Sequence, residues 1–229
     1  MAIVRKYKSI VTDFINPAPG LYQVKFSPLS GKFHFRPGQF LHLALDEYNP
    51  SMPWPESRCF SIQNSPSSNY IKITFSVKGK FTHRMVQELS IGKEIWLKLP
   101  YGEFLQRCSS VKNSVFIAGG TGITPFLSYF TNASFSIMTN PILFLGLREK
   151  KYHIYQEELE VARKINANFV VNIVYEHKDG MLNIENIFKN YGYDFVYFLS
   201  GPQQMLTNIK EYLHNTGLDV DNIITDEWE

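Results

Sequence analysis

The chain has 229 residues, 44% of them hydrophobic, and a formal net charge of +2 at pH 7. Charges of both signs are scattered, which argues against nucleic-acid binding, and no apolar run of about eighteen residues predicts a membrane span. The first residues lack the apolar core of a secretory signal. Two cysteines, Cys59 and Cys108, are too few for a disulfide framework or a four-thiolate iron–sulfur cluster. We therefore expect a cytoplasmic protein with no metal site.

The first half of the sequence is rich in short β-favouring runs separated by proline and glycine turns. Between positions 70 and 77, apolar and polar side chains alternate, as in a strand with one buried face. Several such runs with frequent turns predict a small antiparallel β-barrel over residues 1–108. The expected strands are 10–12, 21–26, 40–45, 58–61, 70–77 and 95–99, with one short helix capped by Thr82.

The second half, residues 109–229, alternates strands with helices after a polar linker at 106–113. This alternation predicts right-handed βαβ units and a parallel sheet with helices on both faces. Ligands of such sheets lie at the carboxyl ends of the strands. The expected strands are 115–118, 142–147, 169–175, 195–199 and 223–225, and the expected helices after the first are 154–164, 184–189 and 203–214.

The run from Val115 to Pro125 is the most informative stretch of the sequence. An apolar strand, three glycines and a first-turn proline predict a sharp turn and a helix that begins at Ile123 or Thr124. Free N–H groups and the positive end of the helix dipole favour a phosphate there. The sequence at 120–125 has the pattern Gly-x-Gly-x-x-Pro, which matches neither a Walker loop nor the Rossmann fingerprint. A tight turn without a ligand is the alternative interpretation.

Two stretches of the barrel half also carry ligand chemistry. In Arg58-Cys59-Phe60-Ser61, strand alternation places the arginine and the aromatic ring on one side. These residue types can pair with a phosphate, stack on a flat ring and hydrogen-bond a ring nitrogen. The turn Gly79-Lys80-Phe81-Thr82 opens a helix and is a second candidate anion site. A surface arginine with a core phenylalanine, and a plain helix cap, are the respective alternatives.

The chain resembles the ferredoxin–NADP reductase superfamily, which joins a flavin-binding β-barrel to a nicotinamide-nucleotide-binding α/β domain. Its motifs follow the family's order over nearly the whole chain: Pro37-Gly38-Gln39-Phe40, then 58–61 for Arg-x-Tyr-Ser, the turn at 79–82, the loop at 119–125 and Ser200-Gly201-Pro202 for Cys-Gly-Pro. The ending 225–229 resembles the family's Glu-x-Phe, with Asp226 and Trp228 in those places. No cysteine quartet indicates the ferredoxin domain that is fused to many relatives.

The resemblance implies a bound FAD and NADH or NADPH as co-substrate. Arg58 would pair with a flavin phosphate, Phe60 would stack on the isoalloxazine in place of tyrosine, and Ser61 would hydrogen-bond flavin N5. Ser61 and Ser200 are the candidate catalytic residues, and serine in place of cysteine at 200 is expected to slow or loosen nicotinamide positioning. The other expected cofactor-binding residues are Cys59, Val77, Gly79, Lys80, Phe81, Thr82, Gly119, Gly120, Thr121, Gly122, Thr124, Pro125, Arg148, Gly201, Pro202 and Trp228.

The function that the resemblance implies is that of a flavoprotein oxidoreductase: hydride passes from NAD(P)H to FAD, and electrons then pass to an acceptor. The acceptor is a protein, such as a ferredoxin, a haem protein or an oxygenase component, or a small molecule. A reductase of free flavin and a non-catalytic electron-relay or regulatory subunit are the alternatives. Arg148, Lys150 and Lys151 suit a 2′-phosphate, whereas Glu149 suits a free 2′-hydroxyl, and we favour tolerance of NADPH.

Overall fold

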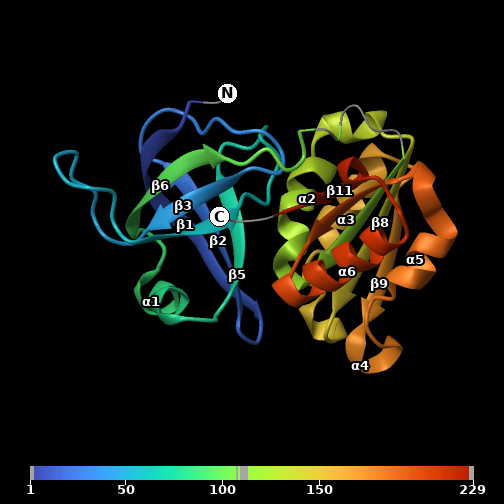
Figure 1. Cartoon of the computed structure of the whole chain (residues 1–229). Coiled ribbons are helices and arrows are strands. Elements are labelled where there is room, and N and C mark those ends of the chain that lie inside the picture. Colours follow the sequence, from blue (N-terminus) through green and yellow to red (C-terminus); the bar gives the residue numbers. More distant parts are fainter. Residues whose placement is uncertain (1–2, 107, 109–112, 227–229) are drawn as a thin grey trace.

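The computed structural model describes residues 3–106, 108 and 113–226 of the chain. Two sheets lie side by side, one in each half of the sequence (Figure 1). Most of the expected linker, the residue after the expected domain boundary, and Trp228 lie outside the described residues. In the part of the chain that is described, no helix is both long enough and apolar enough to cross a membrane.

The first half forms an antiparallel sheet of six strands in the order β4-β3-β6-β1-β2-β5. Their bounds are β1 Arg5–Ala18, β2 Leu21–Pro28, β3 Phe40–Ala44, β4 Ser57–Ser61, β5 Ile71–Ser76 and β6 Glu94–Tyr101. Just after the edge strand β4, the Gln63 N–H donates to the carbonyl of Lys72 in the other edge strand, β5, at 2.9 Å and links the two edges. The expected barrel is confirmed, and Ile71, Ile73 and Phe75 point into its core.

The barrel's helix, α1 (Lys80–Glu88), starts three residues earlier than expected. Its N-cap is Gly79, and Thr82 lies inside the first turn, so the prediction of Thr82 as N-cap is wrong. The reason is that the threonine hydroxyl bonds backward: it accepts hydrogen bonds from the Gly79 N–H at 3.1 Å and the Lys78 N–H at 2.9 Å. A threonine at the third helical position can therefore close the turn as well as a threonine cap.

The second half is a parallel sheet in the order β11-β10-β7-β8-β9, with helices on both faces as expected (Figure 1). The strands are β7 Asn113–Gly119, β8 Asn140–Leu147, β9 Val170–Tyr175, β10 Val196–Ser200 and β11 Ile223–Thr225. The helices are α2 Thr124–Phe130, α3 Gln156–Ile165, α4 Glu176–Asp179, α5 Ile184–Tyr191 and α6 Gln203–Asn215. The single-turn α4 was not predicted, because its four polar residues show no apolar period.

Alternate residues of β7 supply the two cores of this half. Phe116 and Ala118 pack with α2 and α3 on one face of the sheet, whereas Val115 and Ile117 pack with α5 and α6 on the other. Burial on both faces explains why β7 is a continuous apolar run rather than an alternating one. Because β7 lies in the middle of the sheet, its position also sets where the glycine turn that follows it lies.

The halves are joined by polar contacts as well as by packing. Glu158, in the first turn of α3, accepts hydrogen bonds from Lys72 Nζ at 2.7 Å and from Gln63 Nε2 at 2.8 Å. A further bond runs from Asn132 Nδ2, just after α2, to Ser65 Oγ at 3.0 Å. The side chains of Lys72 and Glu158 are only 16% and 19% exposed, so this ion pair is partly shielded from solvent. These contacts set how the barrel faces the parallel sheet.

Candidate functional site

The parallel sheet brings four segments to its carboxyl edge. The glycine turn follows β7, and its neighbours on either side are the ends of β10 and β8. Ser200 therefore lies beside Ala118 in the ladder, and Arg148 directly follows β8. Because β11 pairs with β10, Asp226 reaches the same edge. This is the edge at which ligands bind in open α/β sheets.

The glycine turn is shaped by close approach of two loops. A Cβ on Gly122 would lie 2.6 Å from the carbonyl carbon of Ser200, and one on Gly119 would lie 2.8 Å from Pro202 Cδ. Gly120 differs: its φ is +56°, and a Cβ there would meet no atom of the described residues within 4 Å. Gly119 and Gly122 therefore allow the loops to touch, while Gly120 faces open space.

Helix α2 begins at Thr124, as predicted, after a 3₁₀ turn over Gly120–Ile123. The Thr124 hydroxyl is buried and donates to the Thr121 carbonyl at 2.9 Å, so it holds the turn. Pro125 occupies the first turn, where the missing N–H costs nothing. The turn thus offers a ligand the backbone of Gly120 and Thr121.

A buried hydroxyl and carboxyl meet at the end of β10. Ser200 Oγ donates to Asp226 Oδ2 at 3.1 Å, and the Asp226 N–H donates to the Leu199 carbonyl at 2.9 Å. Burial raises the pKa of Asp226 to about 7, and the hydrogen bond from Ser200 opposes that rise. The carboxyl therefore changes charge near neutral pH. Asp226 was absent from the expected site residues, although its place in the C-terminal motif was the available signal.

Arg148, at the end of β8, is exposed, and its carbonyl accepts a hydrogen bond from the His177 N–H at 3.2 Å. Next to it, Glu149 pairs with Lys151 at 2.8 Å, and this contact lowers the pKa of Glu149. Among the described residues, neither Arg148 nor Lys150 forms an ion pair. This corner of the edge therefore has two uncompensated positive charges.

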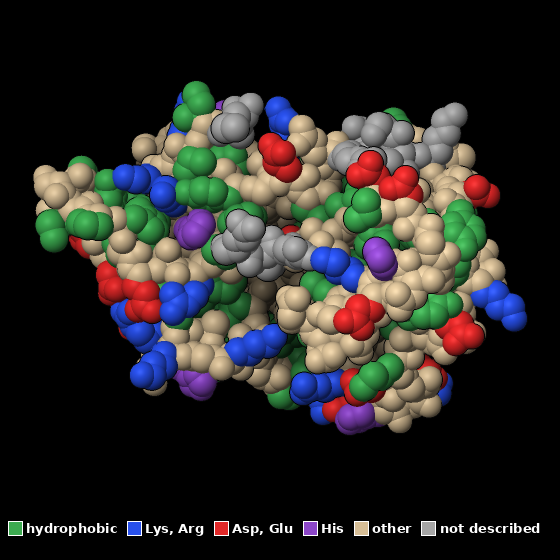
Figure 2. Space-filling view, in the orientation of Figure 1, with side chains coloured by type: hydrophobic (Ala, Val, Ile, Leu, Met, Phe, Trp, Pro, Cys, Tyr) green, Lys and Arg blue, Asp and Glu red, His purple; other side chains and the backbone are tan. Residues whose placement is uncertain are grey.

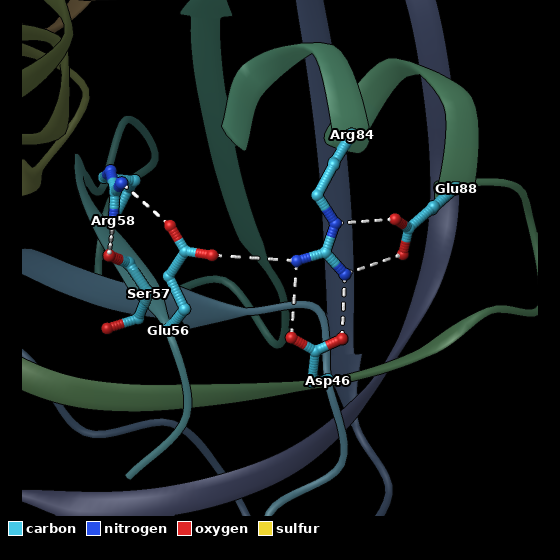
Figure 3. A network of polar contacts seen from close by, with 6 residues as sticks. All are labelled: Asp46, Glu56, Ser57, Arg58, Arg84 and Glu88. Carbon is cyan, nitrogen blue, oxygen red and sulfur yellow. Dashed lines mark hydrogen bonds and ion pairs between the residues drawn. The ribbon is translucent and has the colours of Figure 1, made fainter. Parts of the chain in front are cut away.

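On the barrel side, strand β4 and helix α1 bring the two expected motifs together. The guanidinium carbon of Arg58 lies 5.1 Å from the centre of the Phe81 ring, in the first turn of α1. Arg58 Nη2 pairs with Glu56 at 2.9 Å (Figure 3). Glu56 Oε2 also lies 3.8 Å from Arg84 Nη1, and Arg84 Nη2 pairs with Asp46 Oδ1 at 2.8 Å. Arg58 is thereby kept over the start of the helix.

The start of α1 presents backbone donors rather than the threonine hydroxyl. Thr82 Oγ1 donates to the Gly79 carbonyl at 3.0 Å in addition to the two bonds that it accepts, so its hydrogen is used. The N–H groups of Lys80 and Phe81 have no acceptor within the helix, since both lie in its first turn. The Lys80 side chain is exposed beside them.

Along β4 the side chains alternate as expected. Phe60 is half-buried and packs edge-on against Phe75, with ring centres 6.1 Å apart, while Val77 packs nearby on the same core. The Ser61 hydroxyl has no hydrogen-bond partner among the described residues. The Cys59 thiol is instead 3.6 Å from His42 Nε2, and burial raises its pKa. The alternation turns that thiol away from Phe60.

The two sets of motifs face each other across the interface between the halves. Strand β5 of the barrel lies against the turn Gly120–Ile123. The Gly38 N–H donates to Ser128 Oγ of α2 at 3.4 Å, which places the expected Pro-Gly-Gln-Phe motif at the same interface. Figure 2 shows the surface hollowed between the two halves.

Known proteins share this arrangement. Residues 116–210 match the family described as the oxidoreductase NAD-binding domain. The chain aligns with ferredoxin-NADP+ reductase from Plasmodium falciparum with a TM-score of 0.76, over 98% of this chain and 96% of that one, at 18% identity. The family match at 116–210 and the shared two-domain fold are consistent with the ferredoxin–NADP reductase superfamily. The predicted family and two-domain fold are confirmed.

Curated relatives of this chain are longer. It is 30% identical over 217 residues to the propane 2-monooxygenase reductase component of Rhodococcus jostii, covering 86% of this chain and 56% of that protein. It is 25% identical over 175 residues to the flavohemoprotein of Rhizobium meliloti, covering 73% and 41% respectively. The chain thus spans about half the length of these relatives. The roles of individual site residues, and the domain boundary after residue 108, stay predictions.

Proposed function

We propose that this chain is an NAD(P)H-dependent reductase that binds FAD on the barrel and the nicotinamide nucleotide at the carboxyl edge of the parallel sheet. The observation that carries the proposal is the contact of β5 with the turn Gly120–Ile123, which sets the two candidate sites against each other. Bound FAD would accept hydride from NAD(P)H and supply electrons to an acceptor. The chain's own part is to hold both rings in contact and to exclude water.

The barrel surface fits a flavin dinucleotide. The guanidinium of Arg58 and the free N–H groups of Lys80 and Phe81 form a cradle for a diphosphate. The half-buried ring of Phe60 supplies a stacking face, and the hydroxyl of Ser61, which has no partner among the described residues, is available to a ring nitrogen. Cys59 would contribute its backbone alone.

The sheet edge fits a nicotinamide nucleotide. Gly120 and Thr121 offer open backbone for its diphosphate, while Gly119, Gly122, Thr124 and Pro125 hold the turn in shape. Ser200, Gly201 and Pro202 would line the nicotinamide pocket. The Ser200 hydroxyl is already oriented by Asp226, so this serine is held more firmly than a solvated one.

The structure supports tolerance of NADPH. Glu149, the residue suited to a free 2′-hydroxyl, is engaged by Lys151. Arg148 and Lys150 keep their charges for a 2′-phosphate. The measurement is the ratio of the specificity constants for the two nucleotides, and a ratio above ten in favour of NADH would contradict this part of the proposal.

The acceptor is proposed to be an electron-accepting protein. One relative is named as the reductase component of propane 2-monooxygenase, and such a component passes electrons onward. A ferredoxin, a haem protein, an oxygenase component and a small molecule are all compatible with this chain. The cytoplasmic location stays a prediction.

The test is the visible spectrum of the purified full chain, recorded before and after anaerobic addition of NADH or NADPH. A yellow protein whose flavin band bleaches supports the proposal, and the faster nucleotide identifies the donor. A colourless protein that oxidises the nucleotide only with added flavin indicates a free-flavin reductase instead. A colourless protein that does neither indicates the non-catalytic subunit.

A further inference from the structure

The barrel has a cavity lined by the start of β1 and by the segment between β2 and β3. Its volume is about 330 Å³. The lining residues are Ile3, Arg5, His34, Phe35, Arg36 and Gln39. None of them belongs to the residues assigned above to FAD or to the nicotinamide nucleotide.

The cavity is lined by positive charges that no described carboxylate neutralises. Arg5 and Arg36 line it without an acidic neighbour in the lining, and neither guanidinium pairs with a carboxylate of the described residues. A second cavity of the barrel differs in this respect, because there Lys8 is paired with Glu47 at 3.3 Å and with Glu94 at 2.9 Å. Two unpaired arginines in one hollow are notable in a chain whose net charge is only +2.

The cavity is also built on fixed backbone. Gln39 is buried, its Oε1 accepts from the Arg36 N–H at 2.7 Å, and its Nε2 donates to the Gly102 carbonyl at 2.9 Å. Arg5 lies at the start of β1, where it pairs with Leu99 of β6. The backbone positions of both arginines are therefore fixed by hydrogen bonds, while their side chains are exposed to solvent.

We propose that this cavity binds a small organic anion, namely a phosphate monoester or a dicarboxylate with an apolar part. The planar guanidinium groups of Arg5 and Arg36 suit the paired oxygens of such an anion, and His34 adds a further donor. Ile3 and Phe35 supply apolar surface for the rest of the molecule. A volume of about 330 Å³ is at the lower end for ligand sites, so the occupant is smaller than a dinucleotide.

The test is isothermal titration of the purified full chain at low ionic strength with phenyl phosphate and, separately, with phthalate, a dicarboxylate on an apolar ring. Added FAD and NADP+ fill the proposed reductase sites, so that binding there does not contribute. We expect saturable binding with one molecule bound per chain. The probe that binds more tightly identifies whether the cavity prefers a phosphate or a carboxylate. Arg5→Gln and Arg36→Gln should each raise the dissociation constant tenfold or more. Both side chains are exposed, so both variants should fold.

Lys32→Gln is the matched control, because it removes one positive charge from the same loop without touching the lining. It should keep the dissociation constant within about twofold of the natural chain. Absence of saturable binding of both probes would overturn the proposal. Equal weakening by the lysine and arginine variants would overturn it too. If inorganic phosphate bound as tightly as phenyl phosphate, the organic part of the assignment would be wrong.

Because the lining is separate from the proposed reductase site, the two proposals fail separately. A chain that binds no flavin can still bind the anion, and loss of anion binding in Arg36→Gln should leave the flavin spectrum unchanged. The titration therefore reports on the cavity, whereas bleaching of the flavin band reports on the reductase.

Discussion

Two glycine turns open helices in this chain, one in each half, and their surroundings differ. Gly79 precedes α1 in open space, with an extended φ of −157° that any residue can adopt. Gly122 precedes α2 under the loop that follows β10, where a Cβ would lie 2.6 Å from the Ser200 carbonyl carbon. The first turn is made by local hydrogen bonds, and the second by strands that are distant in sequence. Both turns are expected to bind a phosphate. Contacts between residues close in sequence shape the turn on the barrel, whereas contacts between distant strands shape the turn in the parallel-sheet half.

The largest expected effect comes from Gly122→Ala. The added methyl group meets backbone rather than a flexible side chain, so the β7 and β10 loops must separate, at a cost of about 1–3 kcal/mol in the free energy of unfolding. We expect kcat/KM for NAD(P)H to fall by roughly two orders of magnitude, because a small misplacement of the reacting groups is costly. Steady-state kinetics and urea unfolding measure the two effects.

Gly79→Ala is the matched control for that variant. Its Cβ enters open space, and its backbone angle suits alanine, so the free energy of unfolding should change by less than about 1 kcal/mol. If both variants lost activity to the same extent, the close contact of Gly122 with the Ser200 backbone would not explain the loss in Gly122→Ala.

The second prediction concerns flavin retention on the barrel. Arg58→Ala should weaken FAD binding by about 1.5–3 kcal/mol, or roughly 10- to 100-fold, because a charge-assisted contact is lost. Glu56→Gln should have no effect or the opposite effect, since it frees the guanidinium from its present partner. Fluorescence titration of the FAD-free chain measures both dissociation constants. Full flavin occupancy in Arg58→Ala would argue against the assigned role.

The third prediction concerns the contacts between the halves. Glu158→Gln leaves the partly shielded Lys72 without its counter-charge, so we expect a loss of about 1–2 kcal/mol in the free energy of unfolding. Glu160→Gln, on the same helix, removes a charge but keeps an oxygen that can accept the exposed hydrogen bond from Gln156, so it should change little. Chemical denaturation compares the two variants, and equal stability would show that the interface does not depend on this ion pair.

The smallest expected effect depends on pH. The pKa of Asp226 is raised by burial to about 7 in the folded chain, so the folded state binds its proton more tightly than the unfolded chain does. The stability that this provides is complete below about pH 4 and is lost as the pH rises through about 7. Asp226→Asn cannot ionise, and it keeps an oxygen that can accept the hydrogen bond from Ser200.

The variant should therefore gain a few degrees in Tm relative to the natural chain between pH 5 and pH 8, as thermal unfolding at both values can show. A constant difference in Tm across this range would place the ionisation elsewhere. Ser200→Ala should raise the pKa of Asp226 further, because the hydrogen bond from Ser200 lowers it.

The strands and most helices could be read from the sequence because their signals are local. Alternation over 70–77 and the apolar run after Val115 correspond to β5 and β7. Thr82 was misassigned as a cap because a threonine at the third helical position can also close the turn, by accepting hydrogen bonds from N–H groups that precede it. The exact start of α1 is thus decided by backbone geometry that the residue pattern does not encode.

The candidate site shows the same division. Arg58 and the turn at Gly79 could be singled out from their residue types, and so could the glycine turn after β7. For Asp226 the sequence offered only its place in the C-terminal motif, because its burial and its contact with Ser200 depend on the pairing of β10 with β11. The cavity around Arg5 and Arg36 was equally invisible, since these residues are far apart along the chain.

By itself the sequence predicted the two-domain fold, because periodicity and turn chemistry act over a few residues. The resemblance of its motifs predicted the superfamily and the segments proposed to bind a ligand. Only the tertiary structure decided which glycines face open space and which ones allow two loops to touch. It also decided which carboxyl is buried and which arginines lack a counter-charge. These properties depend on atoms that folding brings together across the sheets, and the free energy of a buried or unpaired charge is set by those neighbours.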